Sequence, residues 1–500
     1  MSLALIQSRA RCGLHAPTVT VEVHLSSGLP AFLLVGLPET SVKEARDRVR
    51  SALLNSGFEF PDKKITVNLA PADLPKESGR FDLAIALGIL KASGQLQADT
   101  SDYEFYGELA LSGALRPIVG EIPLMLACQQ AGHLALMPLD NASQARQIPR
   151  AQVHGAAHLL QVHAFLQHGQ PLPPVPELPQ ASATDWPDLQ DVRGQQQAKR
   201  ALELAAAGGH HLLMFGPAGT GKSMLAQRLP GLLPPLTANE ALSCAAIYSI
   251  AGQPRPLADW QQRPFRQPHH SCSAVALVGG SSVPRPGEIS LAHHGVLFLD
   301  ELPEFPRTVL EVLRQPLEAG TVFISRAARQ AEFPAEFQLV AALNPSPSGH
   351  HQDGRASHEQ IRRYLSRLSG PLLDRIDLQV EVPLLPIQSL HTPQTTESTA
   401  QVRSRVWQAR ERQLQRQHKA NVRLSPAELE QYCQLSQTDK DFLALSLDKL
   451  QLSARCYHKL LRVARTIADL AASPQVSREH MLEAISYRAF DRLLQYLHQS

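Results

Sequence analysis

Hydrophobic and polar residues alternate with different periods in successive parts of the chain. Thr18–Val23 and Lys64–Leu69 alternate β-branched with polar residues, the pattern of half-buried strands. Ser41–Leu54 and Phe81–Ala92 carry the longer period of helices. These four segments predict a mixed α/β domain at the N-terminus.

Further along, short apolar strands alternate with helical segments. His211–Phe215, Val296–Leu299 and Phe337–Leu343 are the clearest of these strands, and this alternation is typical of a parallel sheet. A helix is expected over Met224–Leu229. After about residue 383 the strand signals stop. Ser425-Pro426-Ala427-Glu428 is a capping box, and Ser477 is expected to cap a helix over 478–488, so an all-helical lid should end the chain.

A proline-rich stretch marks the main boundary, because such a run continues neither a helix nor a central strand. Its prolines are Pro171, Pro173, Pro174, Pro176 and Pro179. We expect an N-terminal domain over 1–168, a linker over 169–187, a core over 188–382, a helical connector over 383–424 and a lid over 425–500. Arginines in the stretch 403–419 spread around a helix, which favours a solvated connector over a DNA groove.

Composition narrows the class of protein. The net charge of +2 requires any nucleic-acid affinity to come from a local basic surface. The 6 cysteines are scattered without a C-x-x-C pair, which favours reduced thiols in a cytosol. The apolar run Leu3–Ile6 is too short for a signal peptide, and no stretch has the length of a membrane span. A cytoplasmic protein without a membrane partner is therefore expected.

The strongest motif is a phosphate-binding loop between a strand and a helix, with the pattern G-x-x-x-x-G-K-[ST]. Its glycines turn backbone N–H groups toward phosphates, the lysine reaches the β- and γ-phosphates, and the serine hydroxyl binds Mg²⁺. The motif predicts an ATP and Mg²⁺ site made of Gly216, Pro217, Ala218, Gly219, Thr220, Gly221, Lys222 and Ser223.

Polar residues follow two of the later strands. Asp300 and Glu301 end the first, where Asp300 would hold Mg²⁺ and Glu301 would act as general base. Asn344 ends the second and is a candidate for orienting the attacking water, the role called sensor 1. A turn asparagine before Pro345 is the structural alternative.

Two arginines are further catalytic candidates. Arg375 could act as an arginine finger on a neighbouring subunit's nucleotide, although an ion pair with Asp374 or Asp377 is the alternative. Arg455, at the start of a predicted lid helix, could act as sensor 2, or be a solvated helix arginine.

These motifs, with Asp191–Gln195, Arg263–His270 and Leu372–Arg375, resemble the magnesium-chelatase-like AAA+ proteins, and more closely the ComM (YifB) family of bacterial competence proteins. The resemblance runs almost end to end. It implies a homo-hexameric, ATP-driven DNA translocase that promotes branch migration during natural transformation and recombination. It also implies single-stranded and branched DNA as partners, with recombination proteins as further candidates.

The same resemblance implies a hairpin that faces the pore of the ring. Thr321–Arg326 and Gln330–Phe333 have the pattern of its two strands, and Arg326 and Arg329 are candidates for gripping DNA phosphates. Solvated hairpin arginines are the alternative. The tandem His269-His270 is expected to be structural, because adjacent side chains do not face one metal ion.

The chain departs from its relatives at two places. A cysteine cluster that relatives often carry after sensor 1 is replaced by Asn344–His351, so no structural zinc is expected. The N-terminal domain resembles the proteolytic domain of Lon, but Gly120–Pro123 lies where the catalytic lysine belongs, which leaves Ser78 a weak nucleophile. A non-proteolytic domain is predicted. A chelatase- or MoxR-like protein-remodelling ATPase is the alternative function, and an ATP-dependent protease is disfavoured.

Overall fold

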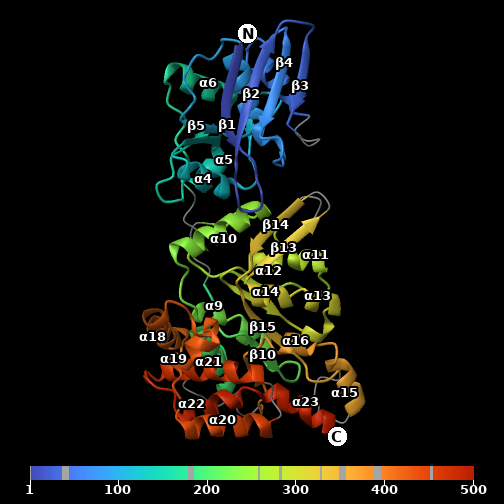
Figure 1. Cartoon of the computed structure of the whole chain (residues 1–500), viewed down its shortest axis with the longest axis vertical. Helices are drawn as coiled ribbons and strands as arrows, with labels where there is room; N and C mark the ends of the chain where they lie inside the picture. The colour runs from blue at the N-terminus through green and yellow to red at the C-terminus, as the bar shows by residue number, and fades with distance from the viewer. Residues whose placement is uncertain are drawn as a thin grey trace.

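The computed structural model describes residues 2–36, 44–177, 185–256, 259–280, 284–326, 329–347, 356–386, 396–450 and 454–499. They form an elongated molecule of three tiers, with the two termini at opposite ends (Figure 1). The first tier carries a mixed sheet, the second a parallel sheet, and the third is helical. Parts of the predicted linker and the start of the helix predicted from Ser41 lie outside these residues.

The first tier is a 7-stranded sheet in the order β3-β4-β2-β1-β5-β8-β9. β1 pairs antiparallel with β2, and β2 with β4, whereas the remaining neighbours are parallel. Residues alternate between buried and partly exposed along β2 and β4, as their sequences predicted. The bounds are β1 Ser2–Arg9, β2 Thr18–Ser26, β3 Ala31–Val35, β4 Lys64–Ala70, β5 Tyr103–Phe105, β8 Leu134–Pro138 and β9 Val153–Ala156.

Helices pack against one face of this sheet, where α3 contacts β1 and β2. α3 (Asp82–Ala92) is buried along nearly its whole length, and α2 (Ala45–Asn55) packs beside it. The remaining elements of the tier are two short strands and three helices: β6 Glu108–Leu109, β7 Leu115–Arg116, α4 Glu121–Gln130, α5 Leu139–Ala145 and α6 Leu159–His168. α4 lies at the lower end of the tier and faces the second tier (Figure 1).

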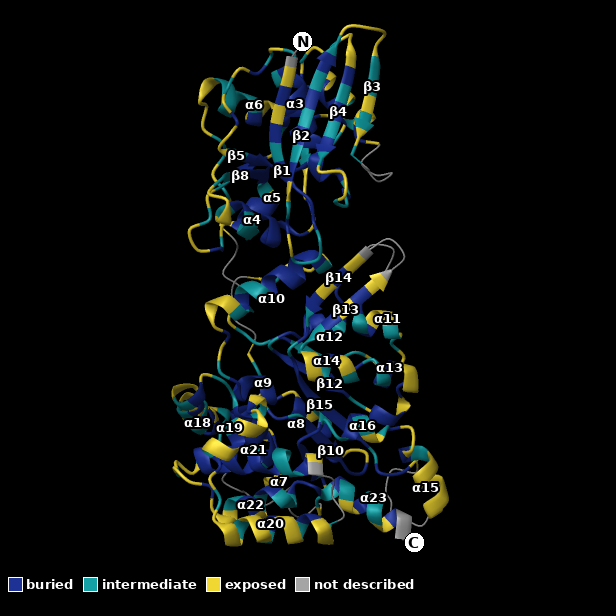
Figure 2. Ribbon diagram, in the orientation of Figure 1, coloured by how far each residue is buried: buried dark blue, intermediate teal, exposed yellow. Residues whose placement is uncertain are grey.

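The second tier is a 5-stranded, all-parallel sheet in the order β11-β12-β15-β10-β16. Its three central strands are buried along their whole length, which is why they read as continuous apolar runs (Figure 2). The bounds are β10 Leu212–Phe215, β11 Phe265–Arg266, β12 Val296–Leu299, β15 Gln338–Leu343 and β16 Leu378–Glu381.

Short helices surround this sheet. The helix predicted over Met224–Leu229 is two helices, α8 (Lys222–Ala226) and α9 (Leu229–Leu232). Pro230 explains the break, because proline cannot donate to the preceding turn. The other helices of the tier are α7 Gln196–Gly208, α10 Ala238–Ala251, α11 Ala274–Val278, α12 Glu288–Leu291, α13 Arg307–Glu311, α14 Arg314–Ala319, α15 His358–Leu365 and α16 Gly370–Leu373.

A two-stranded hairpin projects from the second tier toward the first (Figure 1). β13 (Thr321–Arg326) and β14 (Arg329–Pro334) are antiparallel, and their last pair joins Arg326 to Arg329. Val322, Ile324 and Phe333 are buried at its base. The predicted hairpin is therefore confirmed as a backbone feature.

The third tier is helical, as the loss of strand signals predicted. Ser425 and Ser477 accept hydrogen bonds from the backbone of the helices that follow them, so both predicted caps are confirmed. The bounds are α18 Thr399–Gln417, α19 Pro426–Tyr432, α20 Gln437–Lys449, α21 Ala454–Leu470, α22 Arg478–Ser486 and α23 Ala489–Gln499.

Four of the five arginines of α18 bond to groups of the chain, so the expectation that this stretch is solvated is wrong for them. Arg405 is bonded to Glu203 and Glu397. Arg410 donates to the carbonyl of Ala206, and burial lowers its pKa to about 10. The helix packs against α7 and α21, and Arg412 and Arg416 donate to Asp469 of α21. Arg403 is exposed and lies over the ring of Trp407.

The described residues also answer two expectations about cysteines and helix length. All six cysteines are free thiols. Among the helices that the structure describes, none combines the length and apolarity that a membrane span requires.

The third tier depends on one buried carboxylate, which yields a stability prediction. Asp469 accepts hydrogen bonds from Arg416 at 2.6 Å, Arg465 at 3.1 Å and Asn421 at 2.8 Å. Asp469→Ala should cost about 3–5 kcal/mol, because both guanidinium groups lose their buried counter-charge. Thermal unfolding followed by circular dichroism measures the effect. Asp441→Ala, at an exposed position of α20, is the matched control and should stay within about 0.5 kcal/mol; equal losses in the two variants would contradict this account.

Candidate nucleotide site

The predicted phosphate loop lies between β10 and α8, as its motif requires. Gly219 and Gly221 have φ of +77° and +91°, a left-handed backbone that favours glycine. A Cβ at Gly216 would lie 2.1 Å from the carbonyl oxygen of Val382, because the backbone just after β16 packs directly against the start of the loop. The loop thus needs glycine at these three positions for backbone reasons alone.

Lys222, the first residue of α8, lies folded against the loop. Its ammonium donates to the carbonyl oxygens of Gly216 and Pro217, both at 2.7 Å, and to Oδ1 of Asn344 at 3.1 Å. Burial lowers the pKa of Lys222, and the nearby carboxylate of Asp300 opposes this shift. A buried cation with carbonyl partners is suited to exchange them for phosphate oxygens.

The residues predicted to hold Mg²⁺ are in contact. The hydroxyl of Ser223 donates a hydrogen bond to the carboxylate of Asp300 at 2.6 Å, and Asp300 is the residue that follows β12. A hydroxyl and a carboxylate oxygen are the donor types that Mg²⁺ prefers, and phosphate oxygens usually complete such a site. The pair therefore fits the predicted ion.

Glu301 follows Asp300 but points elsewhere. It has a φ of +52°, and Oε2 lies 3.1 Å from Nδ1 of His270. Glu301 and Asn344 line a cavity of about 330 Å³ together with the loop, Lys222 and Asp300. They also line a second cavity, of about 900 Å³, with His270. Sequence reasoning assigned His270 only a structural role; its position just after β11, the neighbour of β12, was the available signal.

Neither candidate arginine lines the cavity beside the phosphate loop of its own chain. Arg375, just after α16, is bonded to Glu318 of α14 and to the carbonyl of Pro371. Arg455 is exposed, 4.0 Å from Asp374. The alternatives weighed for Arg375, pairs with Asp374 or Asp377, are not the ones formed, because Glu318 takes that place. The trans role of Arg375 and the sensor 2 role of Arg455 remain predictions.

Comparisons with known proteins cover almost the whole chain. The family described as "Magnesium chelatase, subunit ChlI" matches residues 188–390, "Subunit ChlI of Mg-chelatase" matches 21–141, and "Magnesium chelatase, subunit ChlI C-terminal" matches 396–488. The "Competence protein ComM" of Haemophilus influenzae is 54% identical over 99% of both chains. The chain belongs to the magnesium-chelatase-like ComM/YifB family.

Other relatives match this chain over different lengths. The YifB protein of Salmonella typhimurium is 53% identical over 99% of both chains. A magnesium-chelatase 38 kDa subunit of Cereibacter sphaeroides is 27% identical over 38% of this chain and 57% of its own. The likeness to ComM/YifB proteins thus includes the first tier, whereas this chelatase subunit matches a smaller part.

Ser78 of the N-terminal tier lies beside a buried arginine. Ser78 accepts a hydrogen bond from Nε of Arg80 at 3.2 Å, and Arg80 is fully buried. Burial lowers the pKa of Arg80 to about 10, so it still carries its proton at neutral pH. A protonated guanidinium donates a hydrogen bond to the hydroxyl oxygen and cannot act as the base that removes its proton, which agrees with the expectation of a weak nucleophile.

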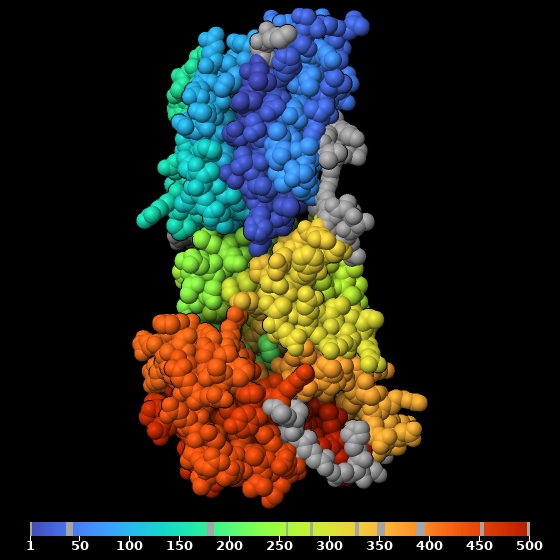
Figure 3. All heavy atoms as spheres, viewed as in Figure 1, coloured from blue at the N-terminus to red at the C-terminus, as the bar shows by residue number. Residues whose placement is uncertain are grey.

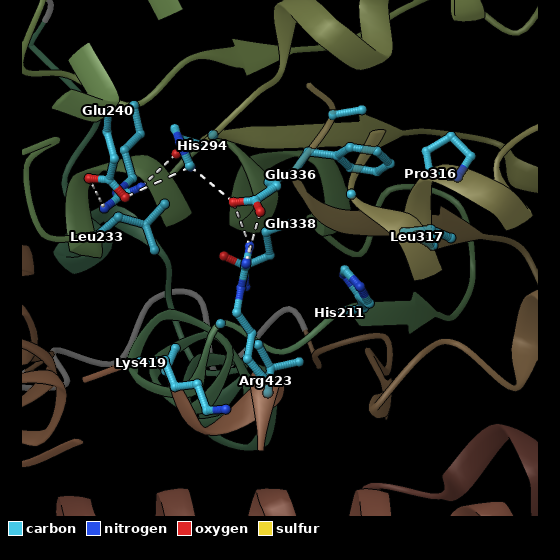
Figure 4. Close-up of a pocket in the computed structure, with 18 of the residues that line it drawn as sticks. His211, Leu233, Glu240, His294, Pro316, Leu317, Glu336, Gln338, Lys419 and Arg423 are labelled. Carbon is cyan, nitrogen blue, oxygen red and sulfur yellow. Dashed lines mark hydrogen bonds and ion pairs between the residues drawn. The ribbon is translucent and has the colours of Figure 1, made fainter. Parts of the chain in front are cut away.

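A further cavity, of about 530 Å³, lies at the opposite edge of the core sheet from the phosphate loop. Figure 4 shows a chain of ion pairs across it, and Figure 3 shows the surface hollowed between the core and the helical tier. His294 lies 3.8 Å from Glu240 and 3.6 Å from Glu336, and Arg423 lies 2.8 Å from Glu336. Burial lowers the pKa of His294, so the cations that pair with Glu240 and Glu336 are Arg263 and Arg423. Arg423 thereby links the helical tier to the core.

The remaining predictions fall at the edge of the described residues. The side chains of Arg326 and Arg329, and Ser348–His351 of the zinc prediction, lie outside them. Among the described residues, no cluster of three histidine, cysteine, aspartate or glutamate side chains could hold a metal ion.

Substituting Lys222 and Glu301 should separate binding from hydrolysis. We expect Lys222→Ala to lose ATP binding, because the loop loses its phosphate-facing charge. Glu301→Gln should bind ATP normally and hydrolyse it about 100-fold or more slowly, because an amide does not accept the water proton. Fluorescent-nucleotide binding and steady-state phosphate release measure the two effects. Wild-type hydrolysis by Glu301→Gln would contradict the general-base assignment.

Proposed function

We propose that the chain is an ATPase whose subunits form a hexameric ring that moves branched DNA during recombination. The observation that carries the ATPase part is the meeting of Lys222, the Ser223–Asp300 pair, Glu301 and Asn344 at one edge of one sheet. The DNA part is supported by the 54% identity to a competence protein over the full chain.

The residues of the site have complementary tasks in this proposal. Lys222 and the loop amides bind the phosphates, and Ser223 and Asp300 hold the Mg²⁺ ion, which neutralises phosphate charge when bound. Asn344, which follows β15, orients a water molecule against the γ-phosphate. Glu301 then accepts that water's proton.

A ring gives the two distant arginines a task. Arg375 lies at the end of a short helix and Arg455 at the start of α21, and neither lines the nucleotide cavity of its own chain. We propose that Arg375 serves a site at a subunit interface, where it would leave Glu318 for the γ-phosphate of the neighbour, and that Arg455 acts as sensor 2.

The hairpin and the first tier complete the proposal. Six hairpins around a pore would place Arg326 and Arg329 in a basic ring despite the near-neutral total charge. We further propose that residues 1–168 form a Lon-like, non-proteolytic domain and residues 425–500 a lid, with the Pro-rich segment 169–187 as linker. The buried Arg80–Ser78 contact supports the loss of proteolysis.

Steady-state ATPase assays with single-stranded and four-way-junction DNA, run beside a labelled-strand release assay, test the whole function. We expect stimulation together with strand release. Arg326→Ala/Arg329→Ala should weaken DNA binding and flatten its salt dependence, since each lost phosphate contact lowers the slope by about 0.7–0.9. Arg314→Ala is the control, because Arg314 of α14 is paired with Glu311 at the end of α13. Healthy basal hydrolysis without any response to DNA would instead favour a protein-remodelling ATPase.

Complementation between two inactive variants tests Arg375. Alone, Arg375→Ala should hydrolyse ATP about 1,000-fold more slowly and Lys222→Ala should be inactive. Mixed in equal amounts they should recover about a quarter of wild-type activity, because half of the sites keep Lys222 and half of their neighbours keep Arg375 in a head-to-tail ring. Mixing Lys222→Ala with Glu301→Gln should recover nothing, since both defects lie on the same side of the interface. No recovery in the first mixture would contradict a finger acting in trans.

A further inference from the structure

We propose that the cavity of about 530 Å³ between the core and the helical tier is a second anion site, where Arg410 and His211 bind a small phosphate-bearing molecule. The cavity lies at the amino ends of the core strands, at the opposite edge of the sheet from the phosphate loop (Figure 4). Ligand binding here does not depend on the proposed DNA function, because none of the residues involved belongs to the nucleotide site or the hairpin strands.

The lining of this cavity carries an unbalanced positive charge. Three arginines line it, and two of them have carboxylate partners: Arg263 lies 3.5 Å from Glu240, and Arg423 lies 2.8 Å from Glu336. The third, Arg410, forms no ion pair with any residue that the structure describes. Burial lowers the pKa of Arg410 only to about 10, so its guanidinium is charged at neutral pH.

The other charged side chains of the lining have partners of their own. Lys419 lies 2.7 Å from Glu428 of α19. Glu318 is bonded to Arg375. Neither of these residues therefore supplies the counter-charge that Arg410 lacks.

The guanidinium of Arg410 is held at the cavity with donors to spare. Nη2 donates to the carbonyl oxygen of Ala206 at 2.8 Å and lies 3.7 Å from the place of a Cβ at Gly209, a residue of the lining. Nε is shielded from solvent and has no hydrogen-bond partner within the described chain. Because an unpaired buried cation is unfavourable, an anion in the cavity would stabilise this arrangement.

A histidine supplies a second donor. Nδ1 of His211, the residue before β10, accepts a hydrogen bond from the backbone N–H of Leu339 at 3.0 Å. Burial lowers the pKa of His211, so its ring is neutral and carries its hydrogen on Nε2. Nε2 forms no hydrogen bond to the residues that the structure describes, and His211 lines the same cavity as Arg410 (Figure 4). A guanidinium and a neutral N–H group can thus donate to one anion.

The size and the chemistry of the lining indicate the ligand. Pockets for small molecules have roughly 300–1,000 Å³, whereas strands of nucleic acid occupy sites of about four or more nucleotides, so this cavity suits one small molecule. Guanidinium donors match the oxygens of a phosphate group. Leu233, Leu317 and Phe337 add an apolar part to the lining. We therefore expect inorganic phosphate or a nucleoside monophosphate to bind.

Binding measurements on the full chain test this site. Lys222→Ala is the parent, so that any binding at the phosphate loop is weak and common to all variants. In this parent, Arg410→Gln should weaken the binding of inorganic phosphate and of adenosine monophosphate about tenfold or more, because charge-assisted hydrogen bonds are lost. Arg403→Gln, at an exposed position of the same helix, is the matched control and should bind like the parent. The rise of Tm with probe concentration, at an ionic strength held constant with chloride, gives each Kd.

A further variant has the opposite expected sign, which a loss of folding could not produce. Glu336→Gln removes a negative charge from the lining and frees Arg423 from its ion pair. It should therefore strengthen the binding of both probes about two- to fivefold.

The outcomes separate the possible ligands. Tighter binding of adenosine monophosphate than of phosphate would identify a nucleotide, and equal or tighter binding of phosphate would identify the free ion; both support the site. Equal affinities in the parent and Arg410→Gln, no strengthening in Glu336→Gln, or no saturable binding of either probe would overturn it. Arg410-dependent binding of a single-stranded tetranucleotide without a terminal phosphate, in place of both probes, would also overturn it and assign the cavity to DNA.

Discussion

The parallel register of three buried strands is the constraint on which the candidate site depends. β15 lies between β10 and β12, with Leu343 opposite Phe215 and Ala341 opposite Leu299. Because all three run the same way, their carboxyl ends meet at one edge, and the loop, Asp300 and Asn344 become neighbours over more than 120 residues of chain. The distances from Lys222 to Asn344 and from Ser223 to Asp300 follow from this register.

At the opposite edge of the sheet, an ion pair between Arg423 and Glu336 links the helical tier to the core. Glu240 at the start of α10, His294 before β12, Glu336 between the hairpin and β15, and Arg423 below form a continuous set of pairs. α10 also meets the first tier, where Ile122 donates to Ser249 and burial raises the pKa of Glu121. One helix thus contacts both the N-terminal tier and this network.

Where local residues dictate local structure, sequence reasoning succeeded. The strand periods, the phosphate loop, the hairpin and the serine caps depend on neighbours within a few residues, and the structure has them in place. It failed where partners come from afar. The α18 arginines look solvated along the sequence, yet Arg416 meets Asp469, 53 residues away. The Arg375–Glu318 and His270–Glu301 contacts join separate elements in the same way.

The sequence by itself therefore determined the mixed α/β class, the family resemblance and the position of the glycine-rich loop between a strand and a helix. These rest on residue type and spacing, and the backbone conformations that glycine and proline impose act within a few residues. Only the tertiary structure decided that Glu301 turns to His270, that Arg375 pairs with Glu318 and that Arg80 donates a hydrogen bond to the hydroxyl of Ser78. Ion pairs and hydrogen bonds form between whichever groups packing brings within about 3 Å, and no local period records that choice.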